Sequence, residues 1–153
     1  PVAHTPVLPY LPMACPCFFP VERMPQATGK KTPPMPLGDA WSGVCRAMPA
    51  GDWLPDPHTQ HRLCNFGYAR EKCARVPAEG PDAVRFGISH DREGLVGIYW
   101  VMEKDHLPFA HGPLEYSRAD DGFRTAHPDA CISRQAQAYV SGYLRRKGDG
   151  GRL

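Results

Sequence analysis

Five of the six cysteines lie in the first half of the chain, in settings that could direct thiolates toward one centre. These five positions are Cys15, Cys17, Cys45, Cys64 and Cys73. Cysteine thiolates are the ligands that structural zinc and iron–sulfur clusters take in proteins. In a reducing compartment, clustered cysteines are more often metal ligands or redox groups than disulfides. The sequence therefore predicts a metal centre held by thiolates.

Cys15 and Cys17 flank a single proline, and thiols two residues apart rarely both face one corner of a metal site. We therefore expect one ligand from this pair, with Cys15 preferred and Cys17 as its alternate. The predicted ligand set is Cys15, Cys45, Cys64 and Cys73. Its intervals of 29, 18 and eight intervening residues match neither the two-residue knuckles of zinc sites nor the repeats of ferredoxins. The prediction rests on the number of cysteines and on their setting.

Aromatic residues surround these cysteines and could screen a centre from water, which tunes the potential of an iron–sulfur cluster. They are Phe18, Phe19, Trp41, Phe66 and Tyr68. We expect an iron–sulfur cluster, [4Fe–4S] before [2Fe–2S], that transfers electrons or senses oxidants. Three alternatives stay open: a zinc-stabilised structural or interaction module, disulfides in an exported protein, and unligated core thiols. Cys131 is expected to be a core thiol in the first turn of the last helix.

Histidines offer two further possibilities. His58 and His61 precede Cys64 at helical spacing, so His61 is a second alternate ligand, although an exposed helix face is the preferred explanation of both histidines. His106 and His111, with Glu103 and Asp105, could serve a metal-dependent enzyme. Polar residues are also usual in a connection between strands. No phosphate loop, nucleotide fingerprint or nucleophile triad accompanies them, so whether the protein is an enzyme stays open.

Charge and hydropathy exclude some classes of partner. The net charge is only +2 and the basic residues are scattered among acidic ones, which implies no nucleic-acid partner. No segment approaches the roughly 20 apolar residues of a membrane span, so no membrane partner is expected. The first residues lack the pattern of a secretory signal, which favours the cytoplasm. A redox or protein partner is expected, of unknown identity.

The elements that must position the cysteines are short. Of the 18 prolines, 13 fall within the first 57 residues, so this part has little regular structure. The apolar spacing of Leu37, Trp41 and Val44 predicts a short helix that ends near Cys45. Asp56 and Pro57 predict a helix cap and first position, followed by a two-turn helix over 58–64. A chain reversal after that helix would bring Cys73 back toward Cys64.

The second half has the pattern of a sheet followed by a helix. Alternating residues predict strands from Ala83, over 95–103 and 113–117, and over 123–125, with a turn over 90–94. Asp129 is expected to cap a helix that ends at Gly148 and Gly150. Its apolar stripe consists of Ile132, Ala136, Tyr139, Val140, Tyr143 and Leu144. The predicted class is α+β, a small antiparallel meander packed on a C-terminal helix, beside an irregular Pro-rich lobe with short helices.

The predicted organisation is an extension over 1–12, one domain over 13–146 and a tail over 147–153. Within the domain, 13–80 form the cysteine-bearing lobe and 81–146 the sheet with its helix.

Four segments of the chain resemble a set of uncharacterised bacterial proteins, chiefly acidobacterial, that share cysteine motifs. The segments are Cys15-Pro16 with Phe18 and Pro20, 37–45, 63–70 with Cys73, and 134–144. The resemblance spans roughly 13–146. It implies that Cys15 is the recurring cysteine and Cys17 a local departure, which favours the same four ligands. It transfers no function.

Overall fold

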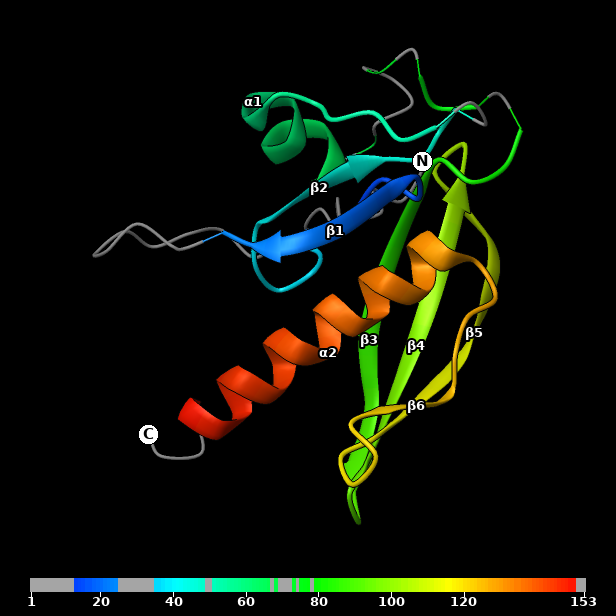
Figure 1. Cartoon of the computed structure of the whole chain (residues 1–153). Helices are drawn as coiled ribbons and strands as arrows, with labels where there is room; N and C mark the ends of the chain where they lie inside the picture. Colours follow the sequence, from blue (N-terminus) through cyan, green and yellow to red (C-terminus); the bar gives the residue numbers. More distant parts are fainter. Residues whose placement is uncertain are drawn as a thin grey trace, which may run out of the picture.

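The structure is a computed structural model that describes residues 13–24, 35–48, 51–66, 68, 73, 75–77 and 79–150. The expected extension over 1–12 lies outside the described residues. The predicted α+β class is confirmed. Strands β3 (Ala83–Arg92), β4 (Leu95–Lys104), β5 (Leu107–Ser117) and β6 (Gly122–Thr125) form an antiparallel meander in sequential order. The long helix α2 (Ala130–Gly150) crosses this sheet (Figure 1).

Each of the two long hairpins of the sheet is closed by a two-residue turn. Glu93 and Gly94 join β3 to β4 with φ of 56° and 79°, and Asp105 and His106 join β4 to β5 with φ of 52° and 64°. Two successive residues with positive φ are typical of turns that match the twist of paired strands. The prediction of a turn over 90–94 was therefore wrong at its start, since β3 continues to Arg92. The strand predicted over 113–117 likewise begins earlier, because β5 starts at Leu107.

Helix α2 begins where its cap was predicted, since the Asp129 carboxylate accepts a hydrogen bond from the Ile132 amide at 3.0 Å. The buried stripe of Ile132, Ala136 and Val140 belongs to the same hydrophobic cluster as the buried residues of the sheet. The helix ends at Gly150, one of the two glycines predicted to end it. Residues 147–150, which were expected to begin a tail, therefore belong to the helix.

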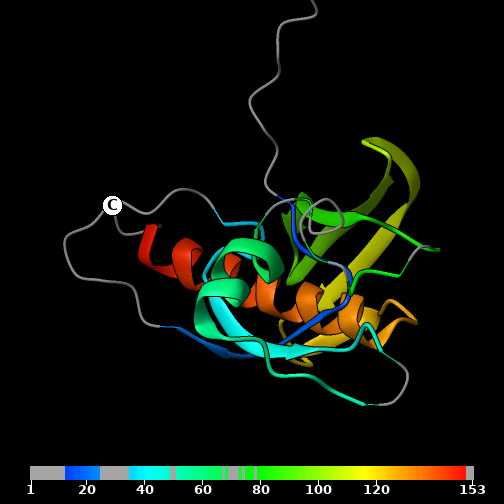
Figure 2. The ribbon, with the colours of Figure 1, turned by 90° about the horizontal axis from the view of Figure 1, so that it is seen from above.

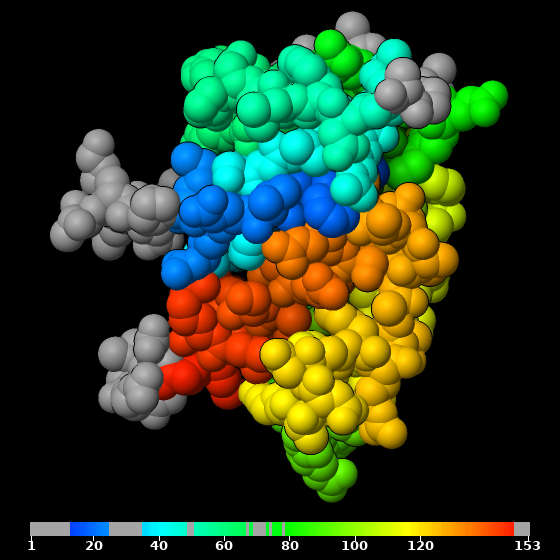
Figure 3. Space-filling view, viewed as in Figure 1, coloured from blue at the N-terminus to red at the C-terminus, as the bar shows by residue number. Residues whose placement is uncertain are grey.

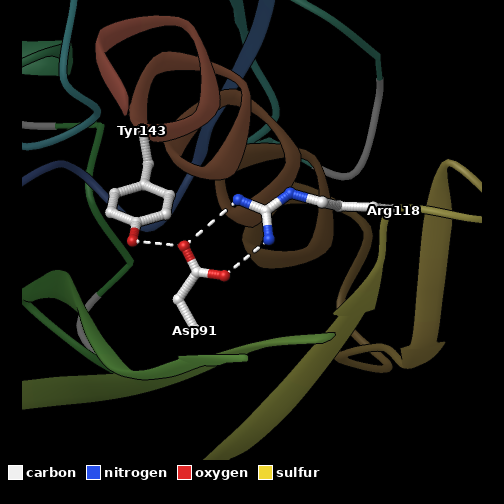
Figure 4. Close-up of polar contacts among 3 residues, drawn as sticks. All are labelled: Asp91, Arg118 and Tyr143. Carbon is white, nitrogen blue, oxygen red and sulfur yellow. Dashed lines mark hydrogen bonds and ion pairs between the residues drawn. The ribbon is translucent and has the colours of Figure 1, made fainter. Parts of the chain in front are cut away.

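Asp91, near the end of β3, ties the sheet to α2 (Figure 4). Its carboxylate accepts hydrogen bonds from Arg118 at 2.5 and 3.1 Å and from the Tyr143 hydroxyl of α2 at 2.7 Å. The Arg118 hydrogen bonds, followed by that of Tyr143, lower the pKa of Asp91 from its ordinary 3.8 to about 2. This carboxylate therefore stays charged well below neutral pH.

The cysteine-bearing lobe contains a hairpin that the sequence did not predict. Strand β1 (Phe18–Arg23) pairs antiparallel with β2 (Trp41–Cys45), where a helix had been expected. Residues of β2 alternate between buried and half-buried, which is the strand period. A Cβ atom on Gly43 would clash with the carbonyl oxygen of Phe19, so the strands approach closely here. Pairing with a distant segment decided this structure, and local spacing could not reveal it.

A short helical segment packs on β2. Helix α1 (Pro57–Thr59) begins at the predicted cap, where Asp56 accepts a hydrogen bond from the Thr59 amide at 2.8 Å. It continues as the π-helix η1 (Gln60–Cys64), which replaces the second α-helical turn that was expected. The hairpin lies between α1 and α2 in Figure 1, and the space-filling view shows its atoms in contact with both (Figure 3). From above, α2 runs between the hairpin and the four-stranded sheet (Figure 2).

Lobe and sheet share one hydrophobic core. Phe18 and Leu37 of the lobe are fully buried in the same cluster as Ile98 of β4 and Ile132 of α2. Cys15 and Cys64 belong to this cluster as well. The thiols of the lobe are therefore positioned by the packing of the whole described molecule.

Candidate functional site

Five cysteines line one small apolar cavity with a volume of about 10 Å³. They come from four separate parts of the lobe, and we call them the cavity cysteines: Cys15, Cys17, Cys45, Cys64 and Cys73. The remaining lining consists of Ala47, Trp53, Thr59, Leu63, Arg75 and Val76. The structure therefore brings all four predicted ligands and the alternate Cys17 to one place. None of the six cysteines, all of which lie in the described residues, forms a disulfide.

Cys15 and Cys17 sit in a β-turn that the intervening proline favours. The Phe18 amide donates to the Cys15 carbonyl oxygen at 3.1 Å, which places Pro16 at the second position of the turn. The Cys15 amide donates to the Cys64 carbonyl oxygen at 3.1 Å, which joins the turn to η1. Cys17 is the largest influence on the pKa of the Cys15 thiol, so these two of the five thiols are close neighbours.

Helix α2 holds this turn from the other side. The fully buried Gln135 amide donates to the carbonyl oxygens of Cys15 and Phe18, both at 2.8 Å. The Cys131 thiol donates to the Cys17 carbonyl oxygen at 3.6 Å. Cys131 itself is buried in the first turn of α2 and does not line the cavity, as expected of a core thiol. Sequence reasoning missed Gln135, because a glutamine inside a helix gives no sign of a partner more than 100 residues away.

Two buried amide side chains place Cys64 against Cys45. Asn65 accepts from the Trp41 amide and donates to the Trp41 carbonyl oxygen, both at 2.8 Å. Gln60 accepts from the Gly43 amide at 2.8 Å. The two ends of η1 are therefore bonded to β2, whose last residue is Cys45.

The Cys45 side of the cavity is closed by a backbone bridge. Cys45 and Trp53 exchange two backbone hydrogen bonds, of 2.7 and 2.9 Å. Trp53 lines the cavity, and the guanidinium of Arg75 stacks on its ring at 3.8 Å. Sequence reasoning missed Trp53 and Arg75 as lining residues. The five aromatic residues that were expected to screen the centre do not line the cavity. The turn-forming Gly51-Asp52 pair after Cys45 was the available sign of a returning strand.

The surroundings of the thiols favour their neutral form. The hydrogen bond with Cys17, and then burial, raise the pKa of Cys15 well above its ordinary value. Burial, followed by the neighbouring Cys45 and Cys73, raises the pKa of Cys64 to about 12. Burial also raises the pKa of Cys45. The causes include other cavity cysteines, so these thiols are close enough to influence one another electrostatically.

The described residues do not by themselves form a coordination sphere. Among them, no group of three or more His, Cys, Asp or Glu side chains is arranged to hold a metal ion. Ligation requires sulfur atoms about 2.3 Å from a common metal. The cavity cysteines face one space, but they would have to turn toward a common point to bind.

The predicted histidine positions lie away from the cavity. His61 is exposed on η1 and is not a lining residue. His106 occupies the β4–β5 turn and stacks on Tyr68, with ring centroids 4.1 Å apart. His111 is exposed on β5 opposite Val101. His106 and His111 therefore belong to no metal-ligating group of the described residues.

A larger cavity of about 420 Å³ lies between the β5–β6 hairpin and α2. Its two charged residues, Asp121 and Arg134, already have partners within the protein. Asp121 accepts from the Tyr116 hydroxyl at 2.5 Å, and Arg134 donates to the carbonyl oxygens of Pro20 and Val21 at 2.7 and 3.1 Å. This cavity therefore identifies no class of ligand.

Within the described residues, no helix combines the length and the apolar character that crossing a bilayer requires. Comparison of the chain with protein-family models, with curated proteins and with solved structures finds no match.

Proposed function

We propose that this protein binds a metal centre through the thiolates of Cys15, Cys45, Cys64 and Cys73. The centre we propose is an iron–sulfur cluster of the [4Fe–4S] type, which transfers electrons or senses oxidants. The observation that supports this function is the convergence of five cysteines on one apolar cavity. The proposal includes kinship with the bacterial cysteine-motif proteins, whose recurring cysteines match the same four positions.

The composition of the cavity supports a soft metal. A single buried cysteine is an ordinary core residue, but core packing does not require five thiols around one space. Among the described residues that line it there is no carboxylate and no imidazole, so sulfur is the only strong metal donor among those side chains. Thiolates select iron–sulfur clusters, zinc and Cu(I) over hard cations. The apolar walls formed by Trp53, Leu63 and Val76 limit water, which tunes a cluster potential.

Zinc is the second candidate, and the cavity volume favours it. A space of about 10 Å³ is nearer to the size of a single ion than to that of a four-iron unit, for which the thiols would have to move apart. Zinc held by the same thiolates would stabilise the Pro-rich lobe, because the binding free energy of a structural metal contributes to folding. In either case the thiols must be reduced to bind, so the proposal places the protein in a reducing compartment such as the cytoplasm. We also propose that the protein works with a redox or protein partner.

Metal analysis of the full chain, purified without oxygen, tests the proposal. A [4Fe–4S] centre gives about four irons and four inorganic sulfides per chain, with broad visible absorption. Zinc gives about one ion per chain and no colour. Protein that contains neither metal and binds neither iron with sulfide nor Zn²⁺ on reconstitution would overturn the proposal.

Matched serine variants test whether the metal is bound by the cavity cysteines. Cys64→Ser and Cys45→Ser are expected to reduce metal content at least several-fold. Cys131→Ser is the control, because it removes an equally buried thiol that does not line the cavity, while the serine hydroxyl can still donate to the Cys17 carbonyl oxygen. Equal metal loss in all three variants would contradict the proposed ligands. Replacement of both His106 and His111 is expected to leave metal content unchanged, and metal loss in that variant would support the metallo-enzyme alternative instead.

A further inference from the structure

The cavity contains one more thiol than a metal centre with four protein ligands uses. Cys15, Cys45 and Cys64 are buried, whereas Cys17 is partly exposed. Cys73 is partly exposed as well, but it lies far from Cys15 in the sequence. Among the cavity cysteines, Cys17 therefore combines partial exposure with a position in the same turn as a predicted ligand, Cys15.

The turn brings these two sulfurs within range of a covalent bond. Cys15 is the first residue of the turn and Cys17 the third, and because consecutive Cα atoms lie about 3.8 Å apart, a bent chain keeps the first and third Cα atoms within about 7 Å. Disulfides join Cα atoms up to about 6.8 Å apart, so residues one and three of the turn are within reach. Both residues line the same small cavity, so their side chains lie on the same side of the turn.

The backbone of this turn is held so that oxidation does not need to rearrange it. Gln135 is bonded to the carbonyl oxygens of Cys15 and Phe18, and Cys131 to that of Cys17. The Arg46 amide donates to the same Cys17 oxygen at 2.9 Å. These hydrogen bonds from α2 and from Arg46 all bind backbone carbonyl oxygens of the turn. They leave the side chains of Cys15 and Cys17 able to rotate toward each other.

We propose that Cys15 and Cys17 are a redox pair, which a hydroperoxide converts to a disulfide. Hydrogen peroxide first oxidises the exposed Cys17 sulfur to sulfenic acid and releases one water. The Cys15 sulfur then attacks the Cys17 sulfur, the S–S bond forms, the S–OH bond breaks, and the hydroxyl leaves as a second water with the Cys15 proton. In sum, two thiols and one peroxide yield one disulfide and two waters.

The consequence for the metal rests on the proposed function. A sulfur in a disulfide is no longer a thiolate, so oxidation removes Cys15 from the ligand set. The pair therefore releases the metal under oxidising conditions, and reduction by a dithiol restores the site. Cys17 then acts as a regulator of the centre and not as one of its ligands.

The disulfide is tested first on metal-free full-length protein, which needs no variant. One equivalent of hydrogen peroxide is added, the remaining thiols are alkylated, and the masses of the proteolytic peptides are measured by mass spectrometry. We expect the loss of two thiols and an internal disulfide in the peptide that ends at Arg23, which is two hydrogens lighter than its reduced form. A disulfide that links Cys17 to Cys45, Cys64 or Cys73, or no thiol loss, would overturn the pairing. This test does not depend on whether the chain binds a metal.

The regulatory step is tested on zinc-loaded protein, because zinc has no redox chemistry and its release reports thiol oxidation alone. Peroxide is expected to release zinc from the unmodified chain, and dithiothreitol with added Zn²⁺ to reload it. Cys17→Ser and Cys17→Ala should retain zinc and release it at least ten-fold more slowly than the unmodified chain. Equal release from the Cys17 variants would overturn the switch while leaving the metal site intact. Failure of the unmodified chain to bind zinc or a cluster would instead count against the proposed function.

Discussion

The side-chain amide of Gln135 donates a hydrogen bond of 2.8 Å to the carbonyl oxygen of Cys15, which joins helix α2 to the turn at the other end of the chain. A second bond of the same length from this amide reaches Phe18. Gln135 is fully buried, so water does not compete for these bonds. The position of two cavity cysteines therefore depends on a residue 120 positions away in the sequence.

Replacement of Gln135 tests this dependence. Gln135→Met preserves the approximate volume but removes both donors, so two buried carbonyl groups lose a partner. Unfilled buried hydrogen-bonding groups cost about 1–3 kcal/mol, and we expect a loss of unfolding free energy in that range. Urea denaturation measures it, with Gln137→Met on the exposed face of α2 as control. Equal stability of the two variants would show that the contact with the turn contributes little.

Removal of the Asp91 carboxylate should weaken the fold in a pH-dependent way. The folded pKa of about 2 lies below the ordinary 3.8, so this charge contributes stability above pH 4 that is lost as the pH falls toward 2. Asp91→Asn is expected to lower the unfolding free energy by about 1 kcal/mol at pH 7, a value reduced for solvent screening because Arg118 is 38% exposed. Between pH 4 and 2, the unfolding free energy of Asp91→Asn should also fall less steeply than that of the unmodified chain. The exposed Asp120→Asn serves as control, and parallel acid curves for Asp91→Asn and the unmodified chain would contradict the prediction.

His127 should contribute a second pH dependence, near neutrality. Its Nδ1 atom accepts from the Asp129 amide at 2.9 Å, and burial lowers its pKa from the ordinary 6.5. The fold therefore favours neutral His127, so the stabilisation is complete above pH 6.5 and is lost as the pH falls through the folded pKa. Urea midpoints at pH 7.5 and 5.0 should differ less in His127→Gln than in the unmodified chain. A control at the exposed His90, as His90→Gln, should retain the full difference.

Gly43→Ala should disrupt the hairpin that leads to Cys45. The added methyl group would clash with the Phe19 carbonyl oxygen, and because that atom belongs to the backbone the strands would have to separate. We expect a loss of about 2 kcal/mol or more in unfolding free energy. The matched control is Gly148→Ala in α2, where no atom lies within 4 Å of the new methyl group. That change should be neutral or stabilising by up to about 1 kcal/mol. Thermal unfolding of both variants decides the comparison.

Local patterns in the sequence predicted the second half of the fold well. The alternation around Val84 and Phe86 and the stripe of α2 are periodic features, because each face of a strand or helix repeats within a few residues. The caps at Asp56 and Asp129 were also correct, since a cap is a bond between residues three apart. The errors in this half were boundaries, where two-residue turns left longer strands than expected.

The sequence by itself determined the α+β class, the caps, and which cysteines are candidate ligands, because these depend on residue type and on spacing within a turn or two of chain. Only the tertiary structure decided that 41–45 is a strand, that Cys17 and Trp53 line the cavity, and that Gln135 holds the cysteine turn. These features are contacts between segments far apart in the chain. Their free energy comes from pairing and burial across the core, which no local spacing encodes.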